Sequence, residues 1–387
     1  MLKGVVSERE NFLDFLRGFS LLGILTVNLP ILAGIHYHSL PLPFESELGK
    51  AIIAFFFTGK FFILFSFVFG YGFSILLSSL ENKNLDAKKI FYKRILGLGV
   101  LGLIHGVFFF EGDILFTYSL LGFFLFKFKD SSEERIFKFI IIFWILSVIF
   151  YGLCGYGQFY KTSQVAQDPN LKKITEEIIA GKLNGFWTGA FQRAQELIVA
   201  FTFVVIPFNM PSAFMMFLFG IYSGKKKLLS DPEKIWNYAK GKKRYIFIVA
   251  LFSNLGYTFS NYSHSGIVSF LLGALLSLGG ISLSLIYVLL LIRIIFMNRS
   301  ENLFVRLISS AGKMSLSNYI LQSVLAGFIF YGWGFGYYTK LEVDKLFLVI
   351  TCIYSCNLIF SHFWLKLYDI GPLEFVLRKW MYYDIDK

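Results

Sequence analysis

Long apolar stretches recur along the whole chain, and they constrain its fold more than any other feature. Of the 387 residues, 56% are hydrophobic and 16% are charged, whereas about a quarter of the residues in soluble globular chains are charged. A stretch of about 20 apolar residues crosses a bilayer as an α-helix, because a helix satisfies its own backbone polar groups in lipid. The stretches do not alternate apolar and polar residues, which argues against a transmembrane β-barrel. The sequence therefore predicts an all-α, polytopic transmembrane helical bundle.

We predict ten spans in a single transmembrane domain that covers residues 1–387. Hydropathy and the 20-residue length requirement place these spans at residues 14–35, 56–80, 92–110, 113–129, 136–158, 195–222, 244–262, 266–295, 312–334 and 345–367.

Lysine and arginine gather in alternate connections, which predicts the orientation. The densest group lies between Lys225 and Arg244, and the connections around Glu111 and Asn261 are poor in basic residues. Because cytoplasmic loops carry the excess of basic residues, both termini are expected to be cytoplasmic. The net charge of +12 then reflects topology, so we expect no nucleic-acid partner.

Two connecting helices are expected outside the spans. The outer connection 159–194 carries a short amphipathic helix, which begins at Asp168–Pro169 and lies on the outer surface. After the last span, Gly371–Pro372 begins a helix over 372–383 at the inner interface.

Two polar residues inside apolar spans mark the candidate site. Asn28 follows Arg17 by eleven residues, and His105 follows Arg94 by the same interval. Eleven residues make about three helical turns and about 16 Å, so each pair shares one helix face. Polar groups at such depth in a bilayer are costly and indicate function.

The chemistry of these side chains suggests distinct roles. His105 is a candidate general base; the alternative is a neutral histidine bonded to a helix carbonyl. Asn28 could orient a histidine or donate to an oxyanion; the alternative is an interhelical contact. Asp113 is expected to cap the fourth span and could also orient a histidine.

Lys60 lies either inside the second span or at its outer edge. The three cysteines all lie in apolar stretches, and Cys352 and Cys356 lack the further ligands that a zinc site needs. We therefore predict no metal site.

Several motifs resemble one known family over nearly the whole chain. They are DFLRGF at 14–19, GKF at 59–61, FGYGF at 69–73, LIH at 103–105, GDIL at 112–115, GKMSLSNY at 312–319 and GPLE at 371–374. The combination resembles the YeiB-like family of bacterial membrane proteins, the domain of unknown function 418. That resemblance implies a multi-pass protein of the bacterial cytoplasmic membrane, and it adds Lys60 to the candidate site.

The family is similar, more distantly, to the transmembrane acyltransferases, which include the acyltransferase-3 proteins and the lysosomal heparan glucosaminide acetyltransferase. Those enzymes move an acyl group from cytosolic acyl-CoA to an acceptor across the membrane. Acyltransferase-3 proteins have a histidine where this chain has Asn28. With an asparagine at this position, the chain is more similar to the glucosaminide acetyltransferase branch. In that branch a histidine follows later in the sequence, and here that histidine would be His36 or His38.

The resemblance implies acyl-CoA as the donor, no tightly bound cofactor, and a sugar, glycolipid or lipid headgroup as the outer acceptor. Arg17, Lys93 and Arg94 would then bind the phosphates of coenzyme A. The alternative is that they are topology-determining residues that reach the lipid headgroups, and for Lys93 we favour it. The main alternative for the whole chain is a transporter or flippase, and another is a non-catalytic partner subunit.

Overall fold

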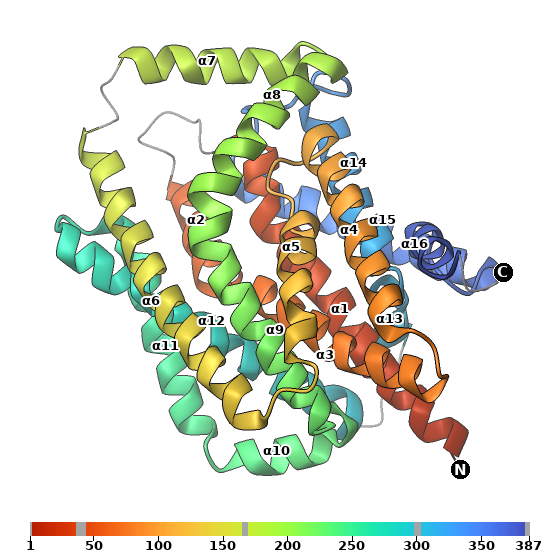
Figure 1. Ribbon diagram of the computed structural model, residues 1–387. Helices are drawn as coiled ribbons and strands as arrows, with labels where there is room; N and C mark the ends of the chain where they lie inside the picture. The colour runs from red at the N-terminus through yellow and green to blue at the C-terminus, as the bar shows by residue number, and fades with distance from the viewer. Residues whose placement is uncertain (1, 36–43, 165–168, 298–302, 384–387) are drawn as a thin grey trace.

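The computed structural model describes residues 2–35, 44–164, 169–297 and 303–383, and these residues form helices joined by short connections without any β-strand (Figure 1). The α-helices are α1 (Leu2–Leu32), α2 (Phe44–Phe56), α3 (Lys60–Asn82), α4 (Ala87–Phe108), α5 (Leu115–Leu125), α6 (Glu133–Gln164), α7 (Pro169–Leu183), α8 (Phe186–Ala200), α9 (Met210–Lys225), α10 (Pro232–Lys240), α11 (Lys243–Phe259), α12 (Gly266–Ile292), α13 (Leu303–Lys313), α14 (Ser315–Phe330), α15 (Val343–Leu367) and α16 (Pro372–Tyr382). The all-α prediction is confirmed.

Seven helical segments of the described chain are long and apolar enough to cross a membrane. They are Phe12–Leu32, Ser46–Asn82, Ala87–Phe108, Glu133–Gln158, Phe186–Lys225, Gly266–Ile295 and Val343–Leu367. Two further apolar helices, Leu115–Phe128 and Ser315–Phe330, are shorter, and so is α11. The protein is thus a multi-pass membrane protein, while the count of ten spans and the cytoplasmic termini stay predictions.

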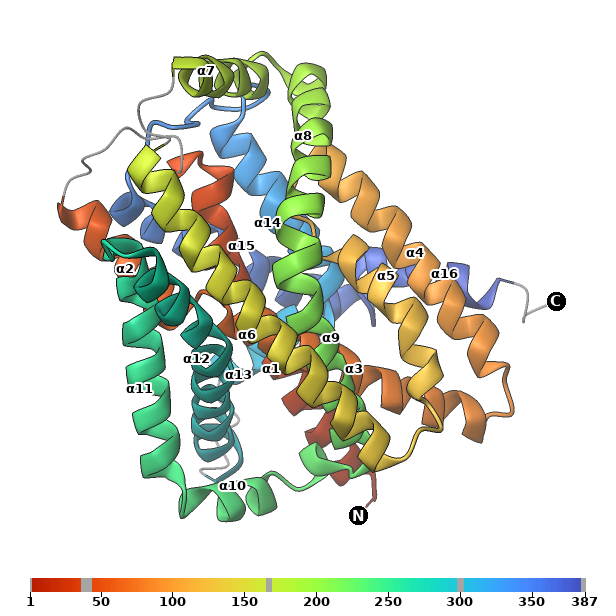
Figure 2. The same ribbon diagram turned by 60° about the vertical axis from the view of Figure 1, so that its left-hand side comes forward.

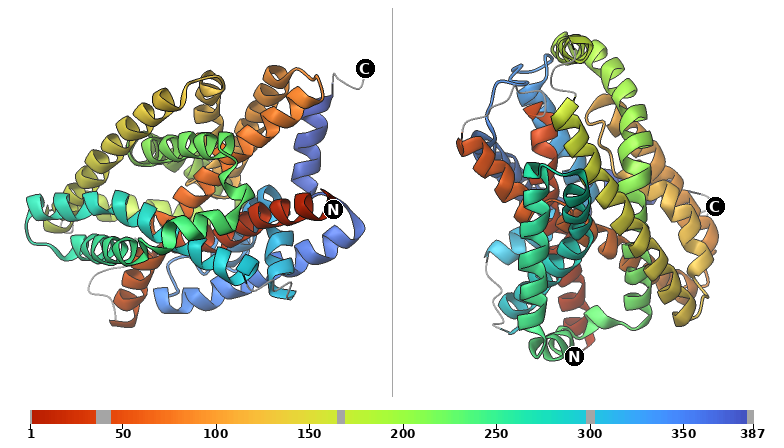
Figure 3. Two further views of the ribbon diagram at one scale, coloured as in Figure 1. Left: turned by 90° about the horizontal axis from the view of Figure 1, so that it is seen from below. Right: turned by 90° about the vertical axis from the view of Figure 1, so that its left-hand side faces the viewer.

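The bundle has two distinct ends. Helix α7 lies across one end, and α10 lies across the opposite end, where the N-terminus is also found (Figures 1 and 2). Seen from below, α6, α11 and α12 gather on one side of the bundle (Figure 3). Large apolar side chains such as Ile198, Phe203 and Leu348 are about two-thirds exposed, as expected for a surface in contact with lipid.

The predicted outer connection 159–194 is wrong at its C-terminal boundary, while the candidate span before it ends at Gln158 as predicted. Helix α6 continues to Gln164, and the next span begins at Phe186 rather than at residue 195. The predicted amphipathic helix corresponds to α7, although it continues through Gly181 to Leu183. Gly185, at φ +96°, allows the sharp turn from α7 into α8. Residues 186–194, which the sequence analysis placed in the outer connection, therefore lie within a candidate span.

Two breaks each separate a pair of consecutive helices, and the first of them lies inside the candidate span Ser46–Asn82. Gly59, at φ +80°, separates α2 from α3, because glycine adopts the left-handed conformation without strain. Met314, at φ −108°, separates α13 from α14 without a left-handed conformation. The first turn of α14 is capped by Glu374 of α16, whose carboxylate accepts hydrogen bonds from the backbone N–H groups of Leu316 (2.8 Å) and Ser317 (3.2 Å). Helix α16 is therefore anchored to the bundle.

Glycines bring several helices into backbone contact. A Cβ atom at Gly70 would lie 2.1 Å from the carbonyl oxygen of Phe217 on α9, and one at Gly220 would lie 2.4 Å from a carbonyl of α3. A Cβ at Gly312 would lie 1.7 Å from the carbonyl oxygen of Asp14, so α13 and α1 also touch. Small residues at such crossings allow the close approach that packs helices in lipid.

Candidate functional site

A buried histidine–carboxylate pair lies where α4 meets α5. Nδ1 of His105 is 2.7 Å from Oδ1 of Asp113, and both side chains are fully buried. The other oxygen, Oδ2, accepts a hydrogen bond of 2.7 Å from the backbone N–H of Phe116. Asp113 thus makes both contacts that the sequence analysis considered, one with the first turn of α5 and one with the imidazole of His105. A Cβ at Gly102 would lie 2.7 Å from Oδ2, so a glycine on α4 makes room for the carboxylate.

The pair leaves the second imidazole nitrogen free to act. A carboxylate beside Nδ1 favours the tautomer with the proton on that nitrogen, so that Nε2 carries the lone pair. Within the described residues, Nε2 of His105 is buried without a hydrogen-bond partner. The predicted alternative, a histidine bonded to a helix carbonyl, is therefore not what the structure shows, because the imidazole contacts a carboxylate instead.

Tyr319 of α14 connects this pair to a cavity. Its ring centroid lies 4.9 Å from that of His105, and its hydroxyl accepts a hydrogen bond of 3.3 Å from the backbone N–H of Ile114. The cavity has a volume of about 260 Å³. The residues that line it come from α1, α3, α4, α5, α14 and α16 and from the α13 end, and include Arg17, Phe65, Phe69, Gly72, Arg94, Leu98, Leu115, Tyr118, Lys313, Ser315, Tyr319, Glu374 and Leu377.

Three cations line the cavity, and two of them were predicted from sequence. Arg17 and Arg94 face it from α1 and α4, and Lys313 joins them from α13. Arg17 also forms an ion pair of 2.7 Å with Asp14. Glu374 is the acidic member of the lining, so the cations exceed the carboxylates there. Such a basic cavity suits a polyanionic ligand.

The other predicted residues lie apart from this cavity. Asn28 is half-buried in α1 and its side chain makes no hydrogen bond to a described residue, so the structure does not join it to His105. Lys93 does not line the cavity, and its carbonyl accepts a hydrogen bond of 3.0 Å from the indole N–H of Trp380. His36 and His38 lie outside the described residues.

Lys60 occupies the inside of the bundle, which decides between its two predicted positions. The side chain is fully buried at the break between α2 and α3. Its ammonium donates a hydrogen bond of 2.8 Å to the carbonyl of Ala54 and lies 5.8 Å from the ring centroid of Tyr257. Ser284 donates to the backbone carbonyl of Lys60 at 2.8 Å.

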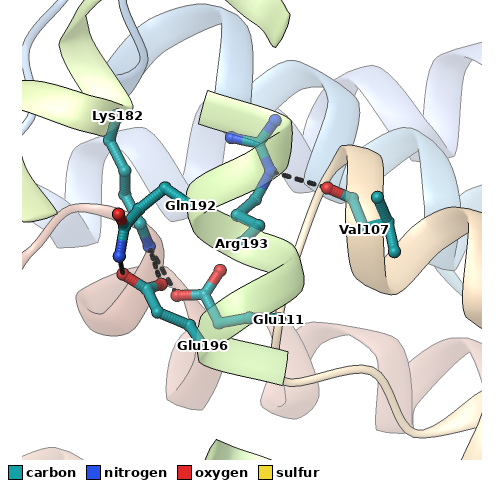
Figure 4. A network of polar contacts seen from close by, with 6 residues as sticks. All are labelled: Val107, Glu111, Lys182, Gln192, Arg193 and Glu196. Atoms are coloured by element: carbon teal, nitrogen blue, oxygen red, sulfur yellow. Dashed lines mark hydrogen bonds and ion pairs between the residues drawn. The ribbon is translucent and has the colours of Figure 1, made fainter. Parts of the chain in front are cut away.

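A second charged cluster, which we call the α7–α8 cluster, lies near the histidine pair and was not predicted. It consists of Glu111, Lys182, Gln192, Arg193 and Glu196 (Figure 4). The ammonium of Lys182 is 2.6 Å from a carboxylate oxygen of Glu111 and 2.7 Å from one of Glu196. Sequence reasoning read Lys182 and Arg193 as loop charges; the available signal was Glu111, which lies two residues before Asp113.

The buried ion pair shifts the acid–base behaviour of both partners. Burial alone would raise the pKa of Glu111, but the adjacent ammonium of Lys182 outweighs it and holds that pKa below its ordinary value. Burial likewise disfavours a charged Lys182, yet Glu111 and the neighbouring tyrosines raise the pKa of Lys182 well above its ordinary value. Both groups are therefore charged at neutral pH.

Comparisons with known proteins confirm the family resemblance. Residues 223–384 match the family model described as "Protein of unknown function (DUF418)". The chain is 28% identical to "Uncharacterized protein YxaH" of Bacillus subtilis, with 98% of this chain and 95% of that protein covered. It is 25% identical to "Uncharacterized protein YeiB" of Escherichia coli, with 96% of each chain covered. No solved structure matches the chain.

Proposed function

We propose that this relative of YeiB is a membrane-embedded acyltransferase of the bacterial cytoplasmic membrane, which transfers an acyl group from cytosolic acyl-CoA to an extracytoplasmic acceptor. One observation carries the proposal. A cavity lined by Arg17, Arg94 and Lys313 is also lined by Tyr319, whose ring contacts the imidazole of the His105–Asp113 pair. Acyl transfer from acyl-CoA requires cations that bind the phosphates of the donor. It also requires a base that accepts the proton of the acceptor, and His105 is placed for that role.

The cavity size indicates which part of the donor enters. Whole small-molecule sites have volumes of about 300–1,000 Å³, and this cavity measures about 260 Å³. It therefore suits the pantetheine arm and a short acyl group. The phosphates of coenzyme A would bind the guanidinium groups of Arg17 and Arg94 at the mouth, where planar bidentate contacts favour phosphate.

The proposed reaction uses the free nitrogen of His105. Nε2 accepts the proton of the acceptor hydroxyl or amine as that group attacks the thioester carbonyl. The carbon–sulfur bond then breaks, and the leaving thiolate of coenzyme A takes the proton back from the imidazolium. Asp113 stabilises the imidazolium while it exists. In a variant of this scheme, His105 itself carries the acyl group briefly.

Calorimetric titration of the purified full-length protein with acetyl-CoA and palmitoyl-CoA tests the donor site. Arg17→Ala and Arg94→Ala should each weaken binding by about 10- to 150-fold, because each removes a charge-assisted contact worth about 1.5–3 kcal/mol. Lys93→Ala is the matched control, since Lys93 is next to Arg94 but does not line the cavity. His105→Ala should bind donor normally and lose about 10²–10⁴-fold in turnover. Absence of binding by any acyl-CoA would refute the proposal.

The acceptor class rests on the family resemblance alone: a surface sugar, a glycolipid or a lipid headgroup. Mass spectrometry of surface glycolipids from wild-type and deletion cells would reveal an acyl group that only the wild type adds. Identical profiles would remove surface glycolipids from the candidates.

A transporter or flippase is the second candidate, and Lys60 is the observation that favours it. Discontinuous helices with buried charges near the bilayer midplane are typical of transporters, and Lys60 lies at such a break. Solute uptake by proteoliposomes that survives His105→Ala but is lost in Lys60→Met would support transport over acyl transfer.

A further inference from the structure

Arg193 has hydrogen-bonding capacity that no described residue uses. The side chain lies fully buried in α8, and its Nε donates a hydrogen bond of 3.2 Å to the carbonyl of Val107. The terminal nitrogens, which carry most of the N–H donors of an arginine, have no hydrogen-bond partner among the described residues. A buried guanidinium is always charged, so such unused donors are costly unless a ligand satisfies them.

The neighbouring carboxylates do not neutralise Arg193. Glu111 and Glu196 both pair with Lys182, and no carboxylate of the described chain lies within ion-pair distance of the guanidinium. Figure 4 shows the terminal nitrogens of Arg193 pointing away from both carboxylates. Arg193 is thus a buried cation that has no carboxylate partner among the described residues.

An aromatic ring and a glycine surround the planar guanidinium of Arg193. Its carbon atom lies 4.8 Å from the ring centroid of Tyr331, whose hydroxyl is also buried without a hydrogen-bond partner. Gly189 lies one turn earlier on α8, and a Cβ there would be 3.1 Å from a terminal nitrogen of Arg193. The aromatic ring therefore packs against the guanidinium, and the missing side chain of Gly189 makes room for it.

We propose that Arg193, assisted by the Tyr331 hydroxyl, binds a phosphate group of the outer substrate. The assignment of this phosphate to the acyl acceptor rests on the proposed function. Arg193 bonds to Val107, which is two residues after His105, so the bound phosphate would place an attached hydroxyl or amine near the histidine pair. The paired N–H groups of a guanidinium match two oxygens of a phosphate.

Inorganic phosphate is the probe, and the full-length protein in phosphatidylcholine nanodiscs is the sample. Phosphate should raise the thermal unfolding midpoint of the wild type, and the increase should saturate as the phosphate concentration rises. Arg193→Gln should weaken the apparent phosphate affinity by about tenfold or more, because it removes a charge-assisted contact. Arg193→Lys keeps the cation without the planar fork and should give an intermediate affinity. Arg244→Gln, an exposed arginine at the start of α11, is the control and should match the wild type.

Nanodiscs that contain phosphatidic acid distinguish two sources of the phosphate. A weaker apparent affinity for inorganic phosphate in these nanodiscs means that the lipid headgroup competes for Arg193. An unchanged affinity assigns the site to a soluble phosphate monoester, and both results support phosphate binding.

Two outcomes would overturn the assignment: no saturable phosphate effect in the wild type, or equal phosphate affinity in wild type and Arg193→Gln. Should Arg193→Gln fail to fold, Arg193→Lys and Tyr331→Phe supply the same comparison, and wild-type affinity in both counts against the site. Acetyl-CoA titration of the same proteins keeps the two proposals separate. Phosphate binding that depends on Arg193, without binding of acetyl-CoA or of any other acyl-CoA, would refute the acyltransferase and leave the phosphate site standing.

Discussion

The carboxylate of Asp113 determines which nitrogen of His105 can accept a proton. The two groups are 2.7 Å apart and shielded from water, so no solvent molecule competes for this contact. In a medium of low polarity, such a contact fixes both the ring orientation and the tautomer.

The substitution Asp113→Asn should separate the two roles of Asp113, which orients His105 and caps helix α5. The asparagine oxygen can still cap α5, but the amide cannot stabilise an imidazolium at His105. We expect turnover to fall by about 10²–10⁴-fold at unchanged donor affinity. Steady-state kinetics together with acyl-CoA titration measure both quantities, and an active Asp113→Asn variant would show that Asp113 only caps the helix.

Lys182→Met should destabilise the fold strongly, because it leaves Glu111 and Glu196 buried without a cation. Removal of one partner from a buried pair costs about 3–5 kcal/mol. Unfolding in detergent, followed by circular dichroism, measures the loss. Lys173→Met, on the exposed part of the same α7 helix, is the control and should change stability little.

The same ion pair predicts how stability depends on pH. Because Lys182 holds the pKa of Glu111 below its ordinary value of 4.5, the pair contributes stability above about that pH. The contribution is lost as the pH falls through the lowered pKa of Glu111. Because the pKa of Lys182 is raised above its ordinary value of 10.5, the stability contributed by the ion pair is lost on the alkaline side only above pH 10.5. Glu111→Gln should therefore flatten the acid limb of an unfolding profile, and a profile like that of the wild type would contradict this assignment.

At the scale of elements, glycine contacts set how closely the helices pack. Gly70 and Gly220 let α3 and α9 cross with their backbones in contact. Gly70→Ala should cost about 1–3 kcal/mol, since the new methyl group would collide with the backbone of Phe217. Gly157→Ala in α6 is the matched control: nothing lies within 4 Å of its Cβ, and helix propensity favours alanine there by about 1 kcal/mol. Equal thermal midpoints for the two variants would refute a backbone contact.

At the scale of the whole molecule, the orientation in the membrane is the main prediction. Helices α7 and α10 cover opposite ends (Figure 1), and the basic residues around α10 predict that this end faces the cytoplasm. In a variant whose native cysteines are replaced by serine, Lys173→Cys on α7 should react with an impermeant maleimide in spheroplasts. Lys240→Cys on α10 should react only after permeabilisation. The reverse pattern would invert the topology and place Arg17 and Arg94 outside.

Local features of the sequence determined much of this architecture. Hydropathy alone indicates the all-helical membrane bundle, because a backbone in lipid must satisfy its own hydrogen bonds. Arg94 and His105 share α4, as the helical repeat predicts. The His105–Asp113 pair is nearly local too, since eight residues and one tight connection join its members. The helix break at Gly59 was harder to predict, because it interrupts the apolar segment Ser46–Asn82.

Only the tertiary structure decided which distant residues meet. Tyr319 reaches the α4–α5 connection across 205 residues, and Lys182 reaches Glu111 across 71. Asn28 has the same spacing from its arginine as His105, yet it makes no hydrogen bond to the histidine pair. Spacing fixes the face of one helix, but contacts between helices depend on where their backbones can approach each other. That approach is decided by small residues and half-helix breaks on several segments at once, which no local pattern in the sequence encodes.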